Sequence, residues 1–419
     1  MLLILFIFTL LALIFAPILI FLFAPGFYFD ADNKSLAVDI LRIMFPYLAL
    51  VSLVSFAAGI QNSHNYFSIP AATPLIFNVI LIIFAIFISD YFTIPVFALA
   101  WGVLLAGFVQ LFIQVFPLRR IGISLKINFR FSNPNILKFK LLILPAILAG
   151  GVTQINLLID TIFASLLATG SPTWLYVSDR LMQFPLGIFA IAIGTVLLPN
   201  LSRYFSTNNL SKFRSTLLGG IKLVIYIGIP SALGLIVFGY HILEMLFQRG
   251  AFSTNDVVMS NLSLQMLSIG LPFFMLMKVL FPSFFAQQDT KTPLYVSLLS
   301  LFLNVVLNYF LAFYLGLGHY GLALGSSISA FIAVSILFVY LKINGFISLG
   351  MSFLSFVVKV IFSTLLMVVF LLGIINFIDF TSISGIISIL SILGIIFLAA
   401  SVFLLSSMLM GIKLKDLIR

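Results

Sequence analysis

The chain is built from apolar runs of about 20 residues, and each is long enough to cross the hydrocarbon core of a bilayer as a helix. The runs are continuous rather than alternating between apolar and polar residues, which favours helices over the strands of a barrel. Hydrophobic residues make up 63% of the chain and charged residues 8%, against about a quarter charged in soluble proteins. The sequence therefore predicts an all-α protein that crosses a membrane many times.

The pattern predicts about twelve membrane-spanning helices. They cover residues 1–16, 37–59, 71–89, 94–116, 140–168, 174–200, 215–238, 256–285, 293–315, 320–342, 352–375 and 383–410. The longest polar link between them runs from Pro117 to Lys140. Once this link is assigned to one side of the membrane, the sides of all the others follow by alternation.

Basic residues gather on one side of these predicted spans. With the long link in the cytoplasm, fifteen of the 21 Lys and Arg residues fall inside, as expected for cytoplasmic loops. They are Arg119, Arg120, Lys126, Arg130, Lys138, Lys140, Arg203, Lys212, Arg214, Lys222, Lys291, Lys342, Lys413, Lys415 and Arg419. Only Lys34, Arg42 and Arg249 fall outside. The net charge of +10 therefore reports topology rather than nucleic-acid binding, and it predicts a cytoplasmic C-terminus.

Other kinds of site find little support in the sequence. The chain has no cysteine, which excludes disulfides and thiol-bound metals. Its three histidines, His64, His241 and His319, are far apart, so we do not expect a histidine metal site. No basic segment separates Met1 from the first apolar run, and this argues against a cleavable signal peptide.

Three charged residues lie inside apolar spans. Between Leu141 and Ser202 the only charged side chains are Asp160, Asp179 and Arg180. A charge at the centre of a helix in a bilayer costs ~2.5–3.5 kcal/mol on insertion scales, so such residues usually have a function. Two of them lie together near the end of a span, close to a proline and a glycine. We expect the functional site here.

The sequence contains a weak internal repeat. A shift of 226 residues superposes Pro46 on Pro272, Gln61 on Gln287 and Asn78 on Asn304. With a slip of three residues, 99–102 matches 322–325. Repeats of this kind are common in transporters. The spans that carry the three charges have no N-terminal counterpart, and Pro17 closes a short first span. We therefore expect that the chain lacks about two and a half N-terminal helices of a six-plus-six design.

Several stretches resemble one known family. They are Ala24–Phe27, Leu41–Tyr47, Asn62–Pro74 with Asn78, Asp179–Gly187, Gly194–Pro199, Arg249–Phe252 and Gln288–Pro293. These stretches follow one another in the family's order over nearly the whole chain. The sequence thus resembles the MurJ (MviN) lipid II flippases of the multidrug/oligosaccharidyl-lipid/polysaccharide exporter superfamily.

The resemblance implies an architecture. Family members have fourteen helices in two six-helix lobes around an inner cavity, with an extra C-terminal pair, and the twelve spans here look like the third to the fourteenth. The implied domains are a truncated N-terminal lobe at 1–120, a basic cytoplasmic linker at 121–139, a C-terminal six-helix lobe at 140–345, and the extra pair with the tail at 346–419.

The resemblance also implies a function: transfer of the undecaprenyl-pyrophosphate-linked peptidoglycan precursor, lipid II, from the inner to the outer leaflet by alternating access. This is transport rather than enzyme catalysis. It implies no cofactor except, in some members, sodium as coupling ion. The implied partners are this glycopeptide lipid and membrane lipids, with no nucleic acid. We expect a monomer in the bacterial cytoplasmic membrane.

Arg180 is the strongest candidate for substrate binding. It matches a family arginine implicated in that role, and a guanidinium offers a planar fork of donors to a pyrophosphate. The alternative is that Arg180 pairs with Asp179 or Asp160, or extends toward the interface. Asp160 and Arg180 are predicted at similar depth on neighbouring antiparallel helices, so a salt bridge between them is one expectation.

A second group of candidates suggests a cation site. Asn304 and Asn308 share a helix face, and their carbonyl oxygens can join Asp160 and the Ser326 hydroxyl around a hard cation. The resemblance supports sodium through Asp160. It weakens the case at Asn308, where the family's described site has an acid. The competing interpretation is hydrogen bonding between helices by buried amides.

Four further side chains complete the candidates. Asp179 either contacts substrate or only orients Arg180, and Gln183 stands where some relatives have Glu. Lys278 and Lys359 either attract the lipid headgroup or extend toward the cytoplasmic interface. Nearby prolines and glycines either permit bending or allow close packing.

Three alternative functions stay open. The first is transport of another polyprenyl-linked glycan or of a drug, because architecture does not fix the substrate. A membrane glycosyltransferase is supported only by Asp30 and Asp32 in an outer loop. A non-functional remnant or a fragment is the third, since important basic residues of the family lie in its first two helices.

Overall fold

The computed structural model describes residues 2–122, 151, 154–348, 350–378 and 386–413. All regular secondary structure within these ranges is helical, which confirms the predicted fold class. The chain forms two compact units, Met1–Leu144 and Pro145–Arg419. Each is described below by itself.

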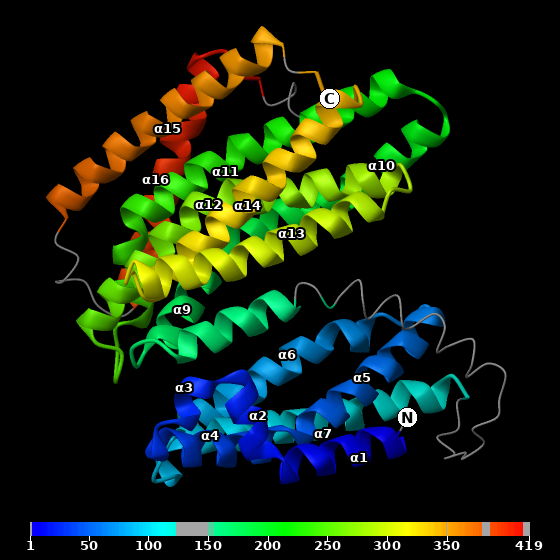
Figure 1. Cartoon of the computed structure of the whole chain (residues 1–419), viewed down its shortest axis with the longest axis vertical. Helices are drawn as coiled ribbons and strands as arrows, with labels where there is room; N and C mark the ends of the chain where they lie inside the picture. The colour runs from blue at the N-terminus through cyan, green and yellow to red at the C-terminus, as the bar shows by residue number, and fades with distance from the viewer. Residues whose placement is uncertain (1, 123–150, 152–153, 349, 379–385, 414–419) are drawn as a thin grey trace. The chain divides into compact units, whose positions relative to one another are not determined.

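The first unit is made of helices that are repeatedly broken (Figure 1). They are α1 (Leu2–Ile14), α2 (Ala16–Phe23), α3 (Pro25–Tyr28), α4 (Ala31–Met44), α5 (Pro46–Ser63), α6 (Ser68–Ile83) with a π-helical turn at Phe84–Ile88 and a 3-10 turn at Ser89–Tyr91, and α7 (Val96–Arg120). Prolines explain two breaks, because proline lacks the backbone N–H that continues a helix. Pro17 lies in the first turn of α2, which bends from α1 by 80°, and Pro46 begins α5.

Helix α7 is the centre of the first unit and packs against α4, α5 and α6. Small residues make this packing close. A Cβ on Gly107 would come within 2.7 Å of the Tyr47 ring and 2.9 Å of Leu50, both on α5. Ala98 and Ala106 are fully buried on the same helix. Because these residues are small, the helix backbones can approach one another closely, as in other membrane helix pairs.

The second unit is a larger bundle around one central helix (Figure 1). It contains α9 (Ser171–Pro185), a π-helical turn at Leu186–Ala190, α10 (Ile191–Ser206), α11 (Leu210–Phe247), α12 (Thr254–Ala286), α13 (Lys291–Asn308) with a π-helical turn at Tyr309–Tyr314, α14 (His319–Ile343), α15 (Met351–Phe377) and α16 (Ile386–Leu409), together with a helical segment at 154–165. Helix α12 packs on α9, α10, α11 and α14.

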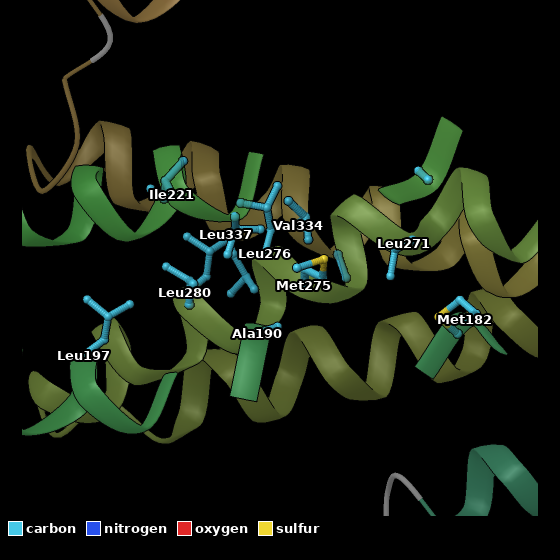
Figure 2. Close-up of a cluster of buried hydrophobic side chains, with 14 of the residues drawn as sticks. Met182, Ala190, Leu197, Ile221, Leu271, Met275, Leu276, Leu280, Val334 and Leu337 are labelled. Carbon is cyan, nitrogen blue, oxygen red and sulfur yellow. The ribbon is translucent and has the colours of Figure 1, made fainter. Parts of the chain in front are cut away.

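The core of the second unit lies along α12. Figure 2 shows Met275, Leu276 and Leu280 of this helix against Val334 and Leu337 of α14. Helices α15 and α16 pack on each other and on α11, where the Tyr226 hydroxyl lies 2.7 Å from Ser407 Oγ. This contact buries two polar side chains as a hydrogen-bonded pair, which avoids leaving either one unsatisfied in an apolar place.

Within the described residues, ten helices are long and apolar enough to cross a membrane, and the bent pair α1–α2 would make eleven. The predicted span at 140–168 falls partly outside the described residues, as do the linker at 121–139 and the start of the last span. The count of twelve therefore stays a prediction.

The structure supports the internal repeat. Helices α7 and α14 are both 25 residues long and begin 223 residues apart, which is the predicted shift of 226 less the slip of three. The helix that precedes each of them ends in a π-helical turn, at Phe84–Ile88 in one case and Tyr309–Tyr314 in the other. With the shift of 226 residues, the first turn falls on 310–314, within the second. A π turn is rare, so its recurrence at matched places is strong evidence for the repeat.

Candidate functional site

Helix α9 has one buried face and one exposed face. Trp174, Ser178 and Met182 are buried at helical spacing, whereas Tyr176 and Arg180 lie on the exposed face. The helix begins after Gly170, whose φ of 101° favours glycine, and it has a proline in its first turn, where the missing N–H is harmless. The sequence thus presents Arg180 on the side that its own bundle does not cover.

The buried face of α9 is fixed to α12 by two polar contacts in one register. Trp174 Nε1 donates to Asp256 Oδ1 at 2.7 Å, and one turn later Ser178 Oγ lies 2.6 Å from the Ser260 carbonyl oxygen. The Trp174 ring also packs edge-on against His319, at 4.8 Å between ring centroids. These contacts prevent α9 from rotating about its axis, and so they fix the direction in which Arg180 points.

Arg180 is bound neither to Asp160 nor to Asp179 by an ion pair within the described residues. Its guanidinium carbon lies 4.8 Å from the centroid of the Tyr176 ring, a cation–π contact one turn away on the same helix. Asp179 accepts a hydrogen bond from Gln183 Nε2 instead. The expected salt bridge between Asp160 and Arg180 is therefore wrong for this conformation, because Gln183 and a different amide supply the partners of the two acids.

The span that carries Arg180 changes its helical geometry directly after it. Pro185 ends α9, and the π-helical turn at Leu186–Ala190 connects it to α10. The two nearby glycines differ. Gly187 has open space where a Cβ would stand, whereas a Cβ on Gly194 would come within 2.7 Å of the Lys278 carbonyl oxygen on α12. Gly194 is thus needed for packing, and Gly187 lies in the irregular turn.

Asp160, Asn304, Asn308 and Ser326 come together as predicted, and we call them the amide cluster. Asn308 Nδ2 donates to Asp160 Oδ1 at 2.7 Å and to Asn304 Oδ1 at 3.0 Å. Asn304 Nδ2 in turn donates to Ser326 Oγ at 3.0 Å. Both asparagines are buried. The cluster links three segments of the second unit: 154–165, α13 and α14.

The orientation of Asn308 decides whether the amide cluster fits a sodium ion. A hard cation needs several oxygens directed at one point. Here Asp160 Oδ1 and Asn304 Oδ1 are both directed at the Asn308 amide nitrogen. Asn308 Oδ1 points away, against Gly325, where a Cβ would collide with it, and it accepts no hydrogen bond from the described residues. The N–H group occupies the place that the ion would need, so this donor set does not fit sodium as arranged.

The two candidate lysines lie apart from these groups. Lys278 is exposed on α12. Lys359 is half-buried on α15, with Nζ about 4.0 Å from where a Cβ would stand on Gly411, just beyond the end of α16. A cation at a helix C-terminus is favoured by the helix dipole. Lys359 therefore has a structural explanation that the sequence did not offer.

One matched motif is explained by capping of a helix. Asp289 Oδ1 accepts hydrogen bonds from the backbone N–H groups of Lys291 and Thr292, both at 3.0 Å, at the start of α13. Burial opposes ionisation of Asp289, but the hydrogen bonds from Thr292 and Lys291 outweigh it and hold the pKa of this loop carboxyl below its usual range. The carboxylate thus satisfies N–H groups that a helix start leaves unpaired.

Sequence reasoning missed a polar ladder in the first unit. Gln61, Gln110 and Gln114 are buried between α5, α6 and α7. Gln61 Nε2 donates to Gln114 Oε1, Gln114 Nε2 donates to Thr73 Oγ1 at 3.1 Å, and Gln110 Nε2 donates to the Thr73 carbonyl at 2.9 Å. The available signal was two glutamines four residues apart in an otherwise apolar span, which places both on one helix face.

The family is decided by comparison with known proteins. The sequence matches the family model for lipid II flippase MurJ over residues 1–408. The chain belongs to the MurJ family. Among relatives in this family, the probable lipid II flippase MurJ of Buchnera aphidicola from Schizaphis graminum is 36% identical over 365 residues, which cover 87% of this chain and 71% of that protein.

Two further MurJ relatives agree. The probable lipid II flippase MurJ of Vibrio cholerae is 39% identical over 331 residues, covering 77% of this chain and 63% of its own. The lipid II flippase MurJ of Burkholderia cenocepacia is 33% identical over 352 residues, covering 83% of this chain and 68% of its own.

Solved structures support the MurJ fold. A structure described as lipid II flippase MurJ in an inward closed conformation superposes with a TM-score of 0.82 at 26% identity, covering all of this chain and 82% of that one. An inward-facing multidrug resistance MATE transporter of the MOP superfamily superposes with a TM-score of 0.69 at 16% identity, covering 82% of this chain and 79% of its own. The second likeness concerns the fold alone.

Proposed function

We propose that this chain moves lipid II from the cytoplasmic to the outer leaflet of the bacterial cytoplasmic membrane for cell-wall synthesis. The observation that carries the proposal is the family match over residues 1–408, together with the superposition on a MurJ structure. The relatives' names give the substrate, a glycopeptide on a polyprenyl pyrophosphate. On this proposal the protein is a monomeric transporter rather than an enzyme, its C-terminus is cytoplasmic, and nucleic acid is not a partner.

Within this function we assign Arg180 to the pyrophosphate. Its guanidinium is exposed, it is fixed in direction by the anchored face of α9, and it forms no ion pair with a carboxylate among the described residues. Arg can bind phosphate oxygens with two parallel hydrogen bonds, which are stronger when both partners are charged. The cation–π contact with Tyr176 holds the charge in place and leaves its N–H groups free.

Asp179 and Gln183 then act as positioning residues. Gln183 donates a hydrogen bond to Asp179, which gives this acid a partner other than its neighbour Arg180. Loss of Gln183 would release Asp179 to pair with Arg180 and would compete with the substrate. We assign Lys278 a contact with anionic lipid headgroups, because its charge lies exposed on a membrane-spanning helix.

We propose that the amide cluster holds its helices together by hydrogen bonds and binds no sodium. The Asn308 amide nitrogen donates both to Asp160 Oδ1 and to Asn304 Oδ1 and so links the two. A hydrogen-bonded network of this kind holds membrane helices in register. The dependence of the protein's thermal stability on sodium tests this proposal.

A growth experiment tests the proposed function. The complete chain is expressed in a bacterium whose own lipid II flippase can be switched off, and growth and lipid II accumulation are measured. The chain is expected to sustain growth, and Arg180→Ala to abolish it while membrane insertion persists. Arg180→Lys should rescue only partly, because a point charge replaces a fork.

The matched control is Arg203→Ala, at the end of α10, where the arginine side chain interacts with Asn200 and Tyr204. This variant should support growth like the unchanged chain. Equal growth with Arg180→Ala would contradict the assignment of Arg180. Failure of the unchanged chain, with lipid II accumulating although the protein is inserted, would contradict the function itself.

A further inference from the structure

The first unit contains a cavity of about 360 Å³ between α5, α6 and α7. Its walls include Tyr47 and Ser55 of α5, Phe77 and Asn78 of α6, and Gln110 of α7. All five lie well inside candidate membrane spans. The volume is within the ~300–1,000 Å³ typical of sites for small ligands.

The walls of the cavity are mainly apolar, with a few polar side chains and no charge. None of the residues that line it, all of them described, is an acid or a base. Ser55 and Asn78 are exposed into solvent-accessible space, and neither side chain has a hydrogen-bond partner among the described residues. At membrane depth, polar groups without partners are costly unless they face water or a ligand. Their free donors and acceptors point to an occupant that is itself polar.

The aromatic side chains of the cavity indicate which kind of ligand fits it. The Tyr47 and Phe77 rings lie 5.5 Å apart between centroids and are tilted by 42°, so together they form an apolar wall beside the amides. The Tyr47 hydroxyl is only loosely engaged, at 3.5 Å from Gln110 Oε1. Uncharged amides and hydroxyls beside aromatic rings match a sugar, which has many hydroxyls and apolar C–H faces. A pyrophosphate would need cations, and an acyl chain would gain nothing from the amides.

The internal repeat shows that this cavity is particular to the first unit. Under the 226-residue shift, Ser55 corresponds to Phe281 and Ala58 to Phe284, and Phe284 is completely buried in the core of the second unit. Gln110 corresponds to the buried Ala333 with the slip of three. At two of these positions the second unit has a phenylalanine where the first has serine or alanine, and at the third it has an apolar alanine where the first has a glutamine.

We propose that the cavity of the first unit binds an amino-sugar of the substrate headgroup, through Ser55 and Asn78, with Tyr47 and Phe77 as the apolar wall. This proposal rests on the proposed function, because it assigns two parts of the same substrate to two different sites. Arg180 takes the charged pyrophosphate, and the neutral cavity takes carbohydrate. The cavity supplies specificity for a glycosylated lipid over a bare polyprenyl pyrophosphate.

Single-cysteine labelling tests this proposal, because the chain has no cysteine of its own. Ser55→Cys, and separately Asn78→Cys, are made in the complete chain, and the rate of reaction with a polar maleimide is measured in detergent. The matched control is Ser63→Cys, which is exposed at the end of the same helix and outside the cavity. Three probes are added in turn: lipid II, undecaprenyl pyrophosphate without sugars, and soluble N,N′-diacetylchitobiose.

Lipid II and the disaccharide are each expected to slow labelling at Ser55→Cys and Asn78→Cys, by ~tenfold at ten times Kd, where about a tenth of the sites stay free. Undecaprenyl pyrophosphate should leave both rates unchanged, and Ser63→Cys should react equally throughout. Equal protection by undecaprenyl pyrophosphate would overturn the sugar assignment. So would failure of both cysteines to react without ligand, since the cavity would then face lipid.

Native mass spectrometry of the same samples separates this proposal from the proposed function. If lipid II is bound but protects neither cysteine, the sugar site is overturned and the function stands. If lipid II does not bind while the disaccharide protects both cysteines, the sugar site stands and lipid II is the wrong substrate. If neither probe protects, the sugar site is overturned whatever the substrate.

Discussion

The two copies of the repeat have a proline at the same position, but the helix around it differs. Pro46 begins a new helix in the first unit, whereas Pro272, its counterpart, lies inside the continuous helix α12. The difference follows from packing. Half of the most apolar window of α12 is buried, against 11% for the span that contains Pro46. A proline removes one helical hydrogen bond in either place. Contacts on all sides keep α12 helical through it, and the first unit has fewer of them.

The buried polar groups of the two units also differ in charge and in burial. The first unit keeps neutral glutamines in its ladder, whereas the second holds a carboxylate in the amide cluster. Asn78 and Asn304 are repeat counterparts, yet Asn78 is exposed and Asn304 is buried with two hydrogen bonds. The comparison teaches that the repeat supplies the backbone, and that the helices packed on it decide which positions become core.

The largest expected effect concerns this pair of asparagines. Asn304→Ala removes both of its hydrogen bonds and leaves the buried Asn308 and the half-buried Ser326 short of a partner; a buried group left so costs ~1–3 kcal/mol. Asn78→Ala removes no hydrogen bond within the described residues. Thermal unfolding in detergent should therefore show a clear loss for Asn304→Ala and almost none for Asn78→Ala. Equal losses would mean that the two units do not differ in this way.

A smaller effect separates the packing of the two units. Gly194→Ala in the second unit directs a methyl group at the backbone carbonyl of Lys278, which cannot move without its helix, and should cost ~1–3 kcal/mol. Gly107→Ala in the first unit meets the side chains of Tyr47 and Leu50, which can rotate. The free energy of unfolding should fall more for Gly194→Ala. The reverse order would contradict the tighter packing of the second unit.

The smallest expected effect is a gain of sodium binding. Asn308→Asp replaces the amide N–H with an oxygen facing Asp160, so that two carboxylates need a cation between them. This variant should be stabilised by sodium relative to choline, by ~1.4 kcal/mol at ten times Kd, and the unchanged chain should not. Sodium-dependent stabilisation of the unchanged chain would show that Asn308 can turn its oxygen to an ion.

Continuous apolar runs of about 20 residues were enough to predict the all-α class, and the repeat was predicted from three pairs of residues that the helix lengths now support. The amide cluster was also predicted, because Asn304 and Asn308 are one turn apart. The partner of Asp160 was not, since depth alone cannot choose between Arg180 and Asn308 on two neighbouring helices. The glutamine ladder and the cavity were missed because they depend on packing between three helices.

We propose that the Arg180 guanidinium on α9, which forms no ion pair among the described residues, binds the pyrophosphate of lipid II during transfer. The most direct measurement is translocation of fluorescent lipid II by the complete chain reconstituted in vesicles. We expect the unchanged chain to transfer lipid II and Arg180→Lys to transfer it partly. Arg180→Ala should give no more transfer than vesicles without protein. Unchanged transfer by Arg180→Ala, at equal reconstitution, would contradict it.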